Sequence, residues 1–305
     1  MLTVVPDYYN EFKCLAERCK HNCCIGWEID IDEDTLKFYS GVEGEFGKRL
    51  AENISHDDEP HFILAQDERC PFLNNKNLCD IISTLGENAL CGICRDHPRF
   101  RNELPDRIEM GLGLCCEEAA RIILTREEKV SLSASGSNDE IIALRDRIFA
   151  VLQNREKDIP ARLADMMALF SVPLPFFDIN AWCKRLLKLE RLDDAWSEAL
   201  ERTAAEVDEA ALDSFDLYMR GRNTEFEQFL VYIIFRHFAV AVAPEEALGR
   251  ACFAAFSYYL LRAMGAQRLL SRGAFTQEDM IDLARTFSAE IEYSDENLYA
   301  IIDSF

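Results

Sequence analysis

The sequence has little positive charge for its length. Lys and Arg together number 33 against 55 Asp and Glu, which gives a formal net charge of −22. A surface with this excess of negative charge repels phosphate backbones, so we expect no nucleic-acid partner. The same charge favours a basic or lysine-bearing partner. Solubility alone would explain an acidic surface as well, without any such partner.

The sequence also lacks a recognisable export or membrane signal. Its start, MLTVVPDYYNEFKC, has no basic stretch followed by an apolar run, so we predict no secretory signal peptide. The longest apolar stretch, residues 226–243, is interrupted by Arg236 and His237, which favours a buried helix over a membrane span. We therefore expect a soluble cytoplasmic protein that has no membrane partner and keeps its thiols reduced.

Cysteine is the residue that is present in excess, and its distribution is uneven. Ten of the twelve cysteines fall within the first 116 residues, whereas Cys183 and Cys252 lie in helical patterns further on and are predicted to be core residues. Clustered cysteines in a reducing compartment indicate metal ligands or a redox centre. The alternative is a secreted disulfide domain, which the long helical remainder disfavours.

The spacing of these cysteines favours an iron–sulfur cluster over zinc. Only Cys91 and Cys94 form the short C-x2-C pair that is typical of zinc sites. Iron–sulfur clusters accept four thiolates from irregularly spaced segments. We predict a cluster, of the 4Fe-4S type, and keep zinc as the alternative.

The surroundings of Cys94 support a cluster. Arg95 and Arg99 lie beside it in CRDHPRF and could offset the negative charge of the thiolates. Ordinary surface pairing with this acidic chain would explain both arginines as well. His21 and His97 are more typical of groups beside a metal site than of ligands.

The polar stretch Ser131–Glu140 predicts a linker between two regions. We expect a cysteine-rich metal-cluster region over residues 1–130 and an α-helical domain over residues 141–305. Trp27–Asp32 alternates apolar and polar residues, Arg107–Leu114 does so loosely, and both predict short strands; Asp32–Glu33–Asp34 could cap a helix that begins after it. The predicted fold class is mainly α, with an irregular metal-binding N-terminal region packed on a helical bundle.

Helical periodicity dominates the second region. The period of 3.6 residues runs from Ile141 and again through residues 179–207. Residues 226–242 and 251–266 are apolar nearly all round, which predicts central helices of a bundle. Thr276 and Ser294 are predicted to begin the last two helices.

Four N-terminal motifs, occurring in order within residues 2–121, resemble the flagellin lysine-N-methylase family. They read PDYYNEFKCLAERCKHNCCIGWEIDIDEDT, CPFLNNKNLC, LCGICRDHPRF and LGLCCEEAAR. In that family the last motif tends to read L-S-C-P-E-A, so Cys116 matches the family cysteine and Cys115 is the least favoured ligand. The candidate metal ligands are then Cys14, Cys19, Cys23, Cys24, Cys70, Cys79, Cys91, Cys94 and Cys116.

The resemblance implies methyl transfer from S-adenosylmethionine to lysine side chains of flagellin by an enzyme that carries an iron–sulfur cluster. Such a reaction needs a neutral amine and a group that takes its proton. The candidate catalytic residues are Tyr8, Tyr9, Asp96 and Glu118, and the candidates for cofactor binding are Trp27, Arg95 and Arg99. Core packing would explain the aromatic residues, and a helix-surface pair with Arg121 would explain Glu118.

The sequence contains neither usual donor-binding signature. It has no G-x-G-x-x-G fingerprint, and Gly26 stands where a C-x3-C-x2-C run from Cys19 needs its third cysteine. The cluster could staple the irregular region or bind the donor at an open iron. The alternative functions are a non-catalytic zinc- or iron-binding adaptor or assembly protein and, less favoured, an electron carrier.

Overall fold

The computed structural model describes residues 1–55, 59–137 and 139–305. Packing divides the chain into two compact units, which we call the thiol unit and the helical unit. The thiol unit is Lys13–Arg99, and the helical unit combines Met1–Phe12 with Phe100–Phe305. Among the described residues, no helix is long and apolar enough to cross a membrane.

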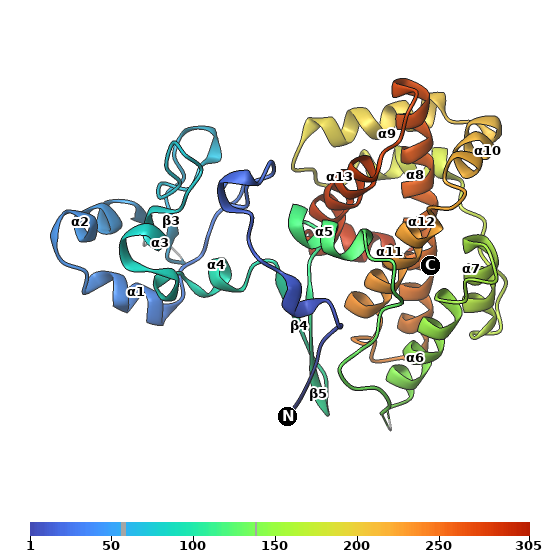
Figure 1. Ribbon diagram of the computed structural model, residues 1–305, viewed down its shortest axis with the longest axis horizontal. Coiled ribbons are helices and arrows are strands. Elements are labelled where there is room, and N and C mark those ends of the chain that lie inside the picture. Colours follow the sequence, from blue (N-terminus) through green and yellow to red (C-terminus); the bar gives the residue numbers. More distant parts are fainter. Residues whose placement is uncertain (56–58, 138) are drawn as a thin grey trace. The chain divides into compact units, whose positions relative to one another are not determined.

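The helical unit contains a short sheet and most of the regular structure of the chain. The sheet has the order β1 (Leu2–Val4), β5 (Arg107–Leu112), β4 (Arg99–Glu103), with β1 parallel to β5. Its helices (Figure 1) are α5 Glu117–Leu124, α6 Glu140–Leu152, α7 Ile159–Ala168, α8 Ile179–Leu186, α9 Asp194–Glu206, α10 Glu209–Tyr218, α11 Asn223–His237, α12 Pro244–Arg272, α13 Gln277–Phe287 and α14 Asp295–Ile302. The short 3-10 helix η1 is Tyr9–Glu11, and the π-helical segment η5 is Ser288–Glu292.

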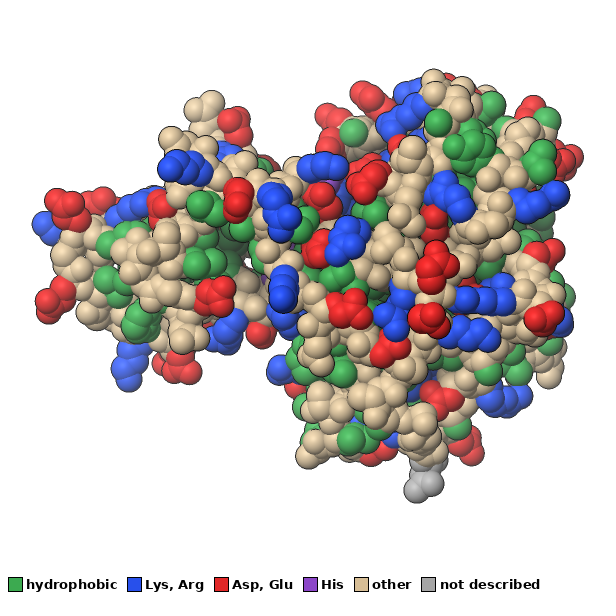
Figure 2. All heavy atoms as spheres, in the orientation of Figure 1, with side chains coloured by type: hydrophobic (Ala, Val, Ile, Leu, Met, Phe, Trp, Pro, Cys, Tyr) green, Lys and Arg blue, Asp and Glu red, His purple; other side chains and the backbone are tan. Residues whose placement is uncertain are grey.

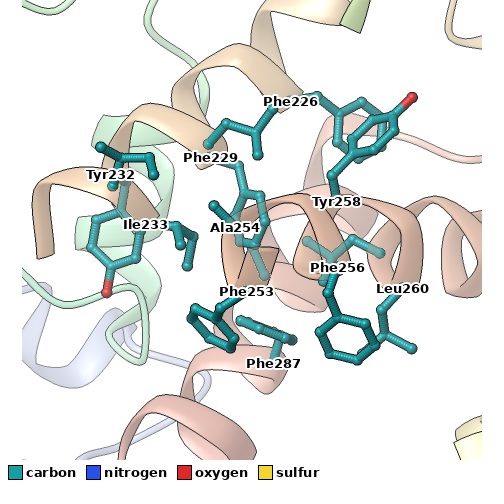
Figure 3. Close-up of a cluster of buried hydrophobic side chains, with 14 of the residues drawn as sticks. Phe226, Phe229, Tyr232, Ile233, Phe253, Ala254, Phe256, Tyr258, Leu260 and Phe287 are labelled. Carbon is teal, nitrogen blue, oxygen red and sulfur yellow. The ribbon is translucent and has the colours of Figure 1, made fainter. Parts of the chain in front are cut away.

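Helices α11 and α12 form the centre of the helical unit, as their apolar composition predicted. Helix α12 packs against α7 to α11, α13 and α14. Figure 3 shows the aromatic and aliphatic side chains that α11, α12 and α13 bury against one another, with Tyr232 at the edge of the cluster. Phe229 and Phe253, both fully buried, pack against Phe287, with ring centroids 5.7 and 6.2 Å away. This burial supplies the main stabilisation of the unit.

Gly265 of α12 lets the Phe215 ring pack directly against the helix backbone. A Cβ at this position would lie 2.5 Å from Phe215 Cζ, and the Phe215 ring is itself held by Phe226 and Phe275. We expect Gly265→Ala to lower the free energy of unfolding by about 1–2 kcal/mol, because overpacking outweighs the gain in helix propensity. Urea unfolding measures this, with Ser271→Ala on the exposed end of α12 as the control. A Gly265→Ala variant as stable as the parent would contradict the packing argument.

The thiol unit has little regular structure and a small core. It contains the helices α1 (Glu33–Ser40), α2 (Gly44–Glu52), α3 (Asp80–Leu85) and α4 (Gly92–Asp96), the 3-10 segments η2 (Ala16–Arg18), η3 (Gln66–Glu68) and η4 (Glu87–Ala89), and the hairpin strands β2 (Ile54–Ser55) and β3 (His61–Phe62). Phe62 and Phe72 meet edge to face at 5.1 Å in this core, and the Tyr39 hydroxyl donates to the Ala89 carbonyl. The core of this unit is much smaller than that of the helical unit.

The structure corrects three expectations from the sequence. Residues 27–32 form only an isolated bridge, Asp30 to His61, and no strand, although Ile29 and Ile31 are buried as the alternation predicted. The helical period over residues 179–207 belongs to two helices, α8 and α9, because a new helix begins where Asp193 caps α9. The packing division also differs from the predicted domains 1–130 and 141–305, because α5 packs on α11 and α13.

Other local expectations are confirmed. Of the predicted capping stretch Asp32–Glu33–Asp34, Asp32 is the N-cap of α1 and accepts from Thr35 N, and Thr276 forms a capping box that begins α13. Strand β5 lies within the predicted Arg107–Leu114 segment. The mainly helical class is confirmed as well. Linker residue 138 lies outside the described residues.

Candidate functional site

Three separate segments of the thiol unit bring cysteines to its core. Cys70 N donates to the Cys24 carbonyl at 2.8 Å, which joins the first segment to the second. Cys79 and Cys91 are the N-cap residues of α3 and α4, and Cys94 lies within α4. Cys70 and Cys91 are buried, and the other three pack against the same core. We call Cys24, Cys70, Cys79, Cys91 and Cys94 the thiol group.

The members of the thiol group influence one another electrostatically. Burial is the main cause that raises the pKa of Cys70 to about 11, and negative charge on Cys79 and Cys91 adds to the shift. A hydrogen bond from Cys94 holds the pKa of Cys91 below its usual range. The pKa of Cys94 is raised by that hydrogen bond, by burial and by charge on Cys24 and Cys70. Such coupling weakens with distance, so charge on one of these sulfurs would affect the protonation of the others.

All twelve cysteines carry free thiols. Within the parts of the chain that the structure describes, however, no three or more Cys, His, Asp or Glu side chains are already arranged as a metal site. The donor set suits soft metals: five neighbouring thiols exceed the four that one iron–sulfur cluster or one structural zinc requires. The chemistry of the thiol group therefore fits either kind of centre.

Four candidate ligands do not belong to the thiol group. Cys14 and Cys19 belong to the loop around η2, where Cys14 Sγ accepts from Ala16 N and the Cys19 thiol donates to the His21 carbonyl. Cys23 is exposed, and its thiol is hydrogen-bonded to that of Cys24. Cys116 is in the helical unit, where it caps α5 and packs on the core. Of the nine predicted ligands, five thus belong to the thiol group, Cys23 is hydrogen-bonded to it, and Cys14, Cys19 and Cys116 lie outside it.

The candidates for cofactor binding are spread over the end of the thiol unit. Trp27 donates from Nε1 to the Cys23 carbonyl, and its ring lies 6.3 Å from that of His97. Arg95 is exposed and lies 3.7 Å from Asp96, and Arg99 begins β4. Burial lowers the pKa of His97 to about 4, so this ring is neutral near pH 7.

The other catalytic candidates are placed by packing. Tyr8 is 1% exposed, burial raises its hydroxyl pKa, and Arg126 lies over its ring at 6.0 Å. Tyr9 packs against the core of the helical unit. Glu118 is paired through both oxygens with Arg121, at 2.7 Å each. These contacts agree with the packing and pairing alternatives that the sequence allowed.

A hollow of about 300 Å³ lies in the thiol unit near α4. Asp30, Asp32 and Glu59 line it together with Ile31, Pro60 and Ile93. Asp32 is committed to backbone groups, since it accepts from Gly92 N at 2.7 Å and from Thr35 N at 2.9 Å. The lining gives the hollow a negative charge, which favours cations.

The helical unit contains a buried polar cluster that the sequence analysis did not assign. Tyr232 and His237 of α11 meet Glu292 of η5, whose carboxylate is completely buried. The Tyr232 hydroxyl lies 3.1 Å from both Glu292 oxygens, and His237 Nε2 lies 2.6 Å from Oε1. Leu114 N and Arg236 Nη1 donate to the same Tyr232 hydroxyl. We call Tyr232, Arg236, His237 and Glu292 the polar cluster.

Electrostatics in the polar cluster fix its charge states. Burial would raise the pKa of Glu292, but Arg236 and His237 hold it below the ordinary value. Burial lowers the pKa of His237, so the imidazole is neutral near pH 7. The signal in the sequence was the interruption of an apolar run by Arg236 and His237. Figure 2 shows that acidic and basic side chains intermingle on the outer face of the helical unit that it displays, whereas this cluster is internal.

Comparison with known proteins gives relatives but no solved structure, since none matches. Residues 177–305 match the family profile of the FliB lysine N-methylase C-terminal domain. This stretch includes the whole polar cluster.

Three curated relatives were found, all from Salmonella. The chain is 29% identical over 136 residues to a protein named Lysine-N-methylase from Salmonella typhimurium. The matched region covers 42% of this chain and 34% of that protein. It is 29% identical over 140 residues to a protein named Flagellar biosynthetic protein FliU from Salmonella muenchen, which is 43% of this chain and 82% of that protein. The chain thus spans about a third of the length of the lysine-N-methylases that it matches. These relatives and the C-terminal match confirm the similarity to the flagellin lysine-N-methylase family that the cysteine motifs predicted.

Proposed function

We propose that this protein is a cytoplasmic protein-lysine N-methyltransferase that acts on flagellin, takes its methyl group from S-adenosylmethionine and holds an iron–sulfur cluster in the thiol unit. The observation that carries the proposal is the gathering of five free thiols in a chain whose C-terminal part matches a lysine N-methylase domain. Relatives named for lysine methylation and for flagellar biosynthesis support the choice of substrate.

The reaction is a single displacement. The lone pair of a neutral lysine amine forms the new N–C bond while the S–C bond of the sulfonium breaks and its electron pair stays on sulfur. The protein must position the two reactants, remove water and accept the proton that the methylated amine loses. With 22 more negative than positive charges, the surface attracts a lysine-presenting substrate.

The cluster has a structural role in this proposal. Four of Cys24, Cys70, Cys79, Cys91 and Cys94 would hold it, and the bonds to iron would staple three segments that share only a small core. Arg95 beside Cys94 is exposed and would offset part of the negative charge. The proposal thus assigns the stability of the thiol unit to metal as well as to burial.

The test starts from protein purified without oxygen. We expect iron and sulfide in comparable amounts, a brown colour and methylation of flagellin lysines when S-adenosylmethionine is added, measured by mass spectrometry. The control is flagellin and donor without the enzyme. Metal without donor binding or methylation would contradict the enzyme and support the adaptor. A colourless protein with stoichiometric zinc would contradict the cluster alone.

A further inference from the structure

Arg236 of the polar cluster lies between two aromatic rings. Its guanidinium carbon is 5.0 Å from the centroid of the Phe100 ring and 4.6 Å from that of Tyr293. The Phe100 ring can occupy its position only because residue 111 is glycine, since a Cβ at Gly111 would lie 2.3 Å from Phe100 Cζ. Two rings hold the plane of a guanidinium in a fixed orientation. The side chain is therefore preorganised, and it is 11% exposed.

The hydrogen bonds of Arg236 leave part of its guanidinium free. Nη1 donates to the Tyr232 hydroxyl at 2.8 Å, and Nε lies 3.6 Å from Glu292 Oε1, which is too long for a hydrogen bond. Within residues 1–55, 59–137 and 139–305, no acceptor is recorded for Nη2.

Other partly buried arginines of the helical unit are paired differently. Arg155 and Arg222 each make a two-nitrogen pair with a glutamate, Glu227 and Glu225. At Arg236 the neighbouring carboxylate already accepts from Tyr232 and His237. The remaining edge of this guanidinium is thus available for a planar anion.

The side chain of Arg236 is not completely buried, since 11% of it is exposed. Tyr293 beside it is 47% exposed, and its hydroxyl hydrogen-bonds the thiol of Cys115. A ligand can therefore meet the guanidinium and a tyrosine ring at the same place.

We propose that Arg236 binds the carboxylate of the amino-acid portion of the sulfonium methyl donor; this inference rests on the proposed function. A carboxylate matches the fork of a guanidinium and carries one charge. Arg236 and Glu292 are of opposite charge, so the site suits a monoanion better than a phosphate. The exposed part of the Tyr293 ring suits the positive sulfur of the same ligand, because an aromatic face attracts cations.

The proposal is tested by calorimetry with S-adenosylhomocysteine and with its analogue that lacks the carboxylate. We expect Arg236→Gln to weaken binding of S-adenosylhomocysteine by about 10- to 100-fold, as expected for the loss of a charged hydrogen-bonded pair. Binding of the decarboxylated analogue should change little. Arg236→Lys keeps the positive charge but loses the two-pronged geometry of the guanidinium, so its affinity for S-adenosylhomocysteine should lie between those of the wild type and Arg236→Gln. Arg202→Gln, on the exposed face of α9, is the control.

The outcomes separate the two proposals. If the wild type and Arg236→Gln bind S-adenosylhomocysteine equally while flagellin is methylated, the role of Arg236 is wrong and the proposed function stands. Equal binding of both compounds by the wild type would also overturn the carboxylate contact. If the wild type binds no donor and methylates nothing, both proposals fail. Circular dichroism shows whether Arg236→Gln is folded. If it is not, the proposal is still tested by Arg236→Lys and by the difference between the two compounds in their binding to the wild type.

Discussion

A Cys94→Ala variant purified without oxygen is expected to lose its visible absorption and most of its bound iron, whereas a Cys183→Ala variant is expected to keep both. The pKa of Cys94 responds to Cys91, Cys24 and Cys70, which belong to the three segments that supply the thiol group. Cys183 is fully buried in α8 of the helical unit and only fills space there. Iron analysis and a visible spectrum measure the difference.

The loss of metal should also unfold the thiol unit. Binding of a structural metal contributes about 10 kcal/mol or more of folding free energy in small domains, which is as large as the stability of a whole domain. We therefore expect limited proteolysis of Cys94→Ala to cleave within residues 13–99 and to leave the helical unit intact. A Cys94→Ala variant that retains iron, or that resists the protease as the parent does, would contradict the assignment.

Single substitutions of the other members of the thiol group test which of them would hold the proposed cluster. A 4Fe-4S cluster takes four thiolates, and the thiol group has five members. Replacing each member in turn should remove the cluster in four cases and leave it in one. Cys14 and Cys19, on the loop around η2, are expected to be dispensable. Retention of the cluster in most single variants would show that the thiols substitute for one another.

The sequence predicted features whose cause is local. Asp32 caps α1 and Thr276 caps α13, because a side-chain oxygen bonds an amide three residues on, and this spacing is visible in one dimension. The alternation in residues 27–32 predicted the burial of Ile29 and Ile31 but also a strand, which was wrong. A regular ladder needs a partner strand of similar length, and β3, which pairs with this segment at His61, has only two residues.

Features that depend on distant contacts could not be predicted in the same way. Clustering in the sequence indicated a thiol site but did not separate Cys24 from Cys14, since the separation depends on where Cys70 docks. The polar cluster joins Tyr232 to Glu292, 60 positions apart. Arg236 within an apolar run was visible, but its carboxylate partner follows α13 on the π-helical segment η5, and no local pattern connects the two.

Removing the carboxylate of Glu292 is expected to destabilise the helical unit strongly. Glu292→Ala leaves Tyr232 and His237 without their shared acceptor and Arg236 without its neighbouring opposite charge, and breaking a buried charged network from one side costs about 3–5 kcal/mol. Glu292→Gln keeps an acceptor oxygen and should lose less. Urea unfolding at pH 7 measures both, with Glu201→Gln on the exposed face of α9 as the control. Equal stability of parent and Glu292→Ala would contradict this role.

The dependence on pH has a defined sign. The pKa of Glu292 is lowered from 4.5 on folding, so its contribution is complete above about pH 4.5 and is lost as the pH falls through the lower folded value. The pKa of His237 is lowered from 6.5, so its neutral form favours folding above about pH 6.5 and this contribution also falls with acid. Both groups therefore make the parent less stable as the pH falls from 7 to 4. Glu292→Gln should show a shallower loss below about pH 4.5, because its amide does not titrate. A variant whose stability falls as steeply there as that of the parent would show that the acid sensitivity arises at other carboxylates.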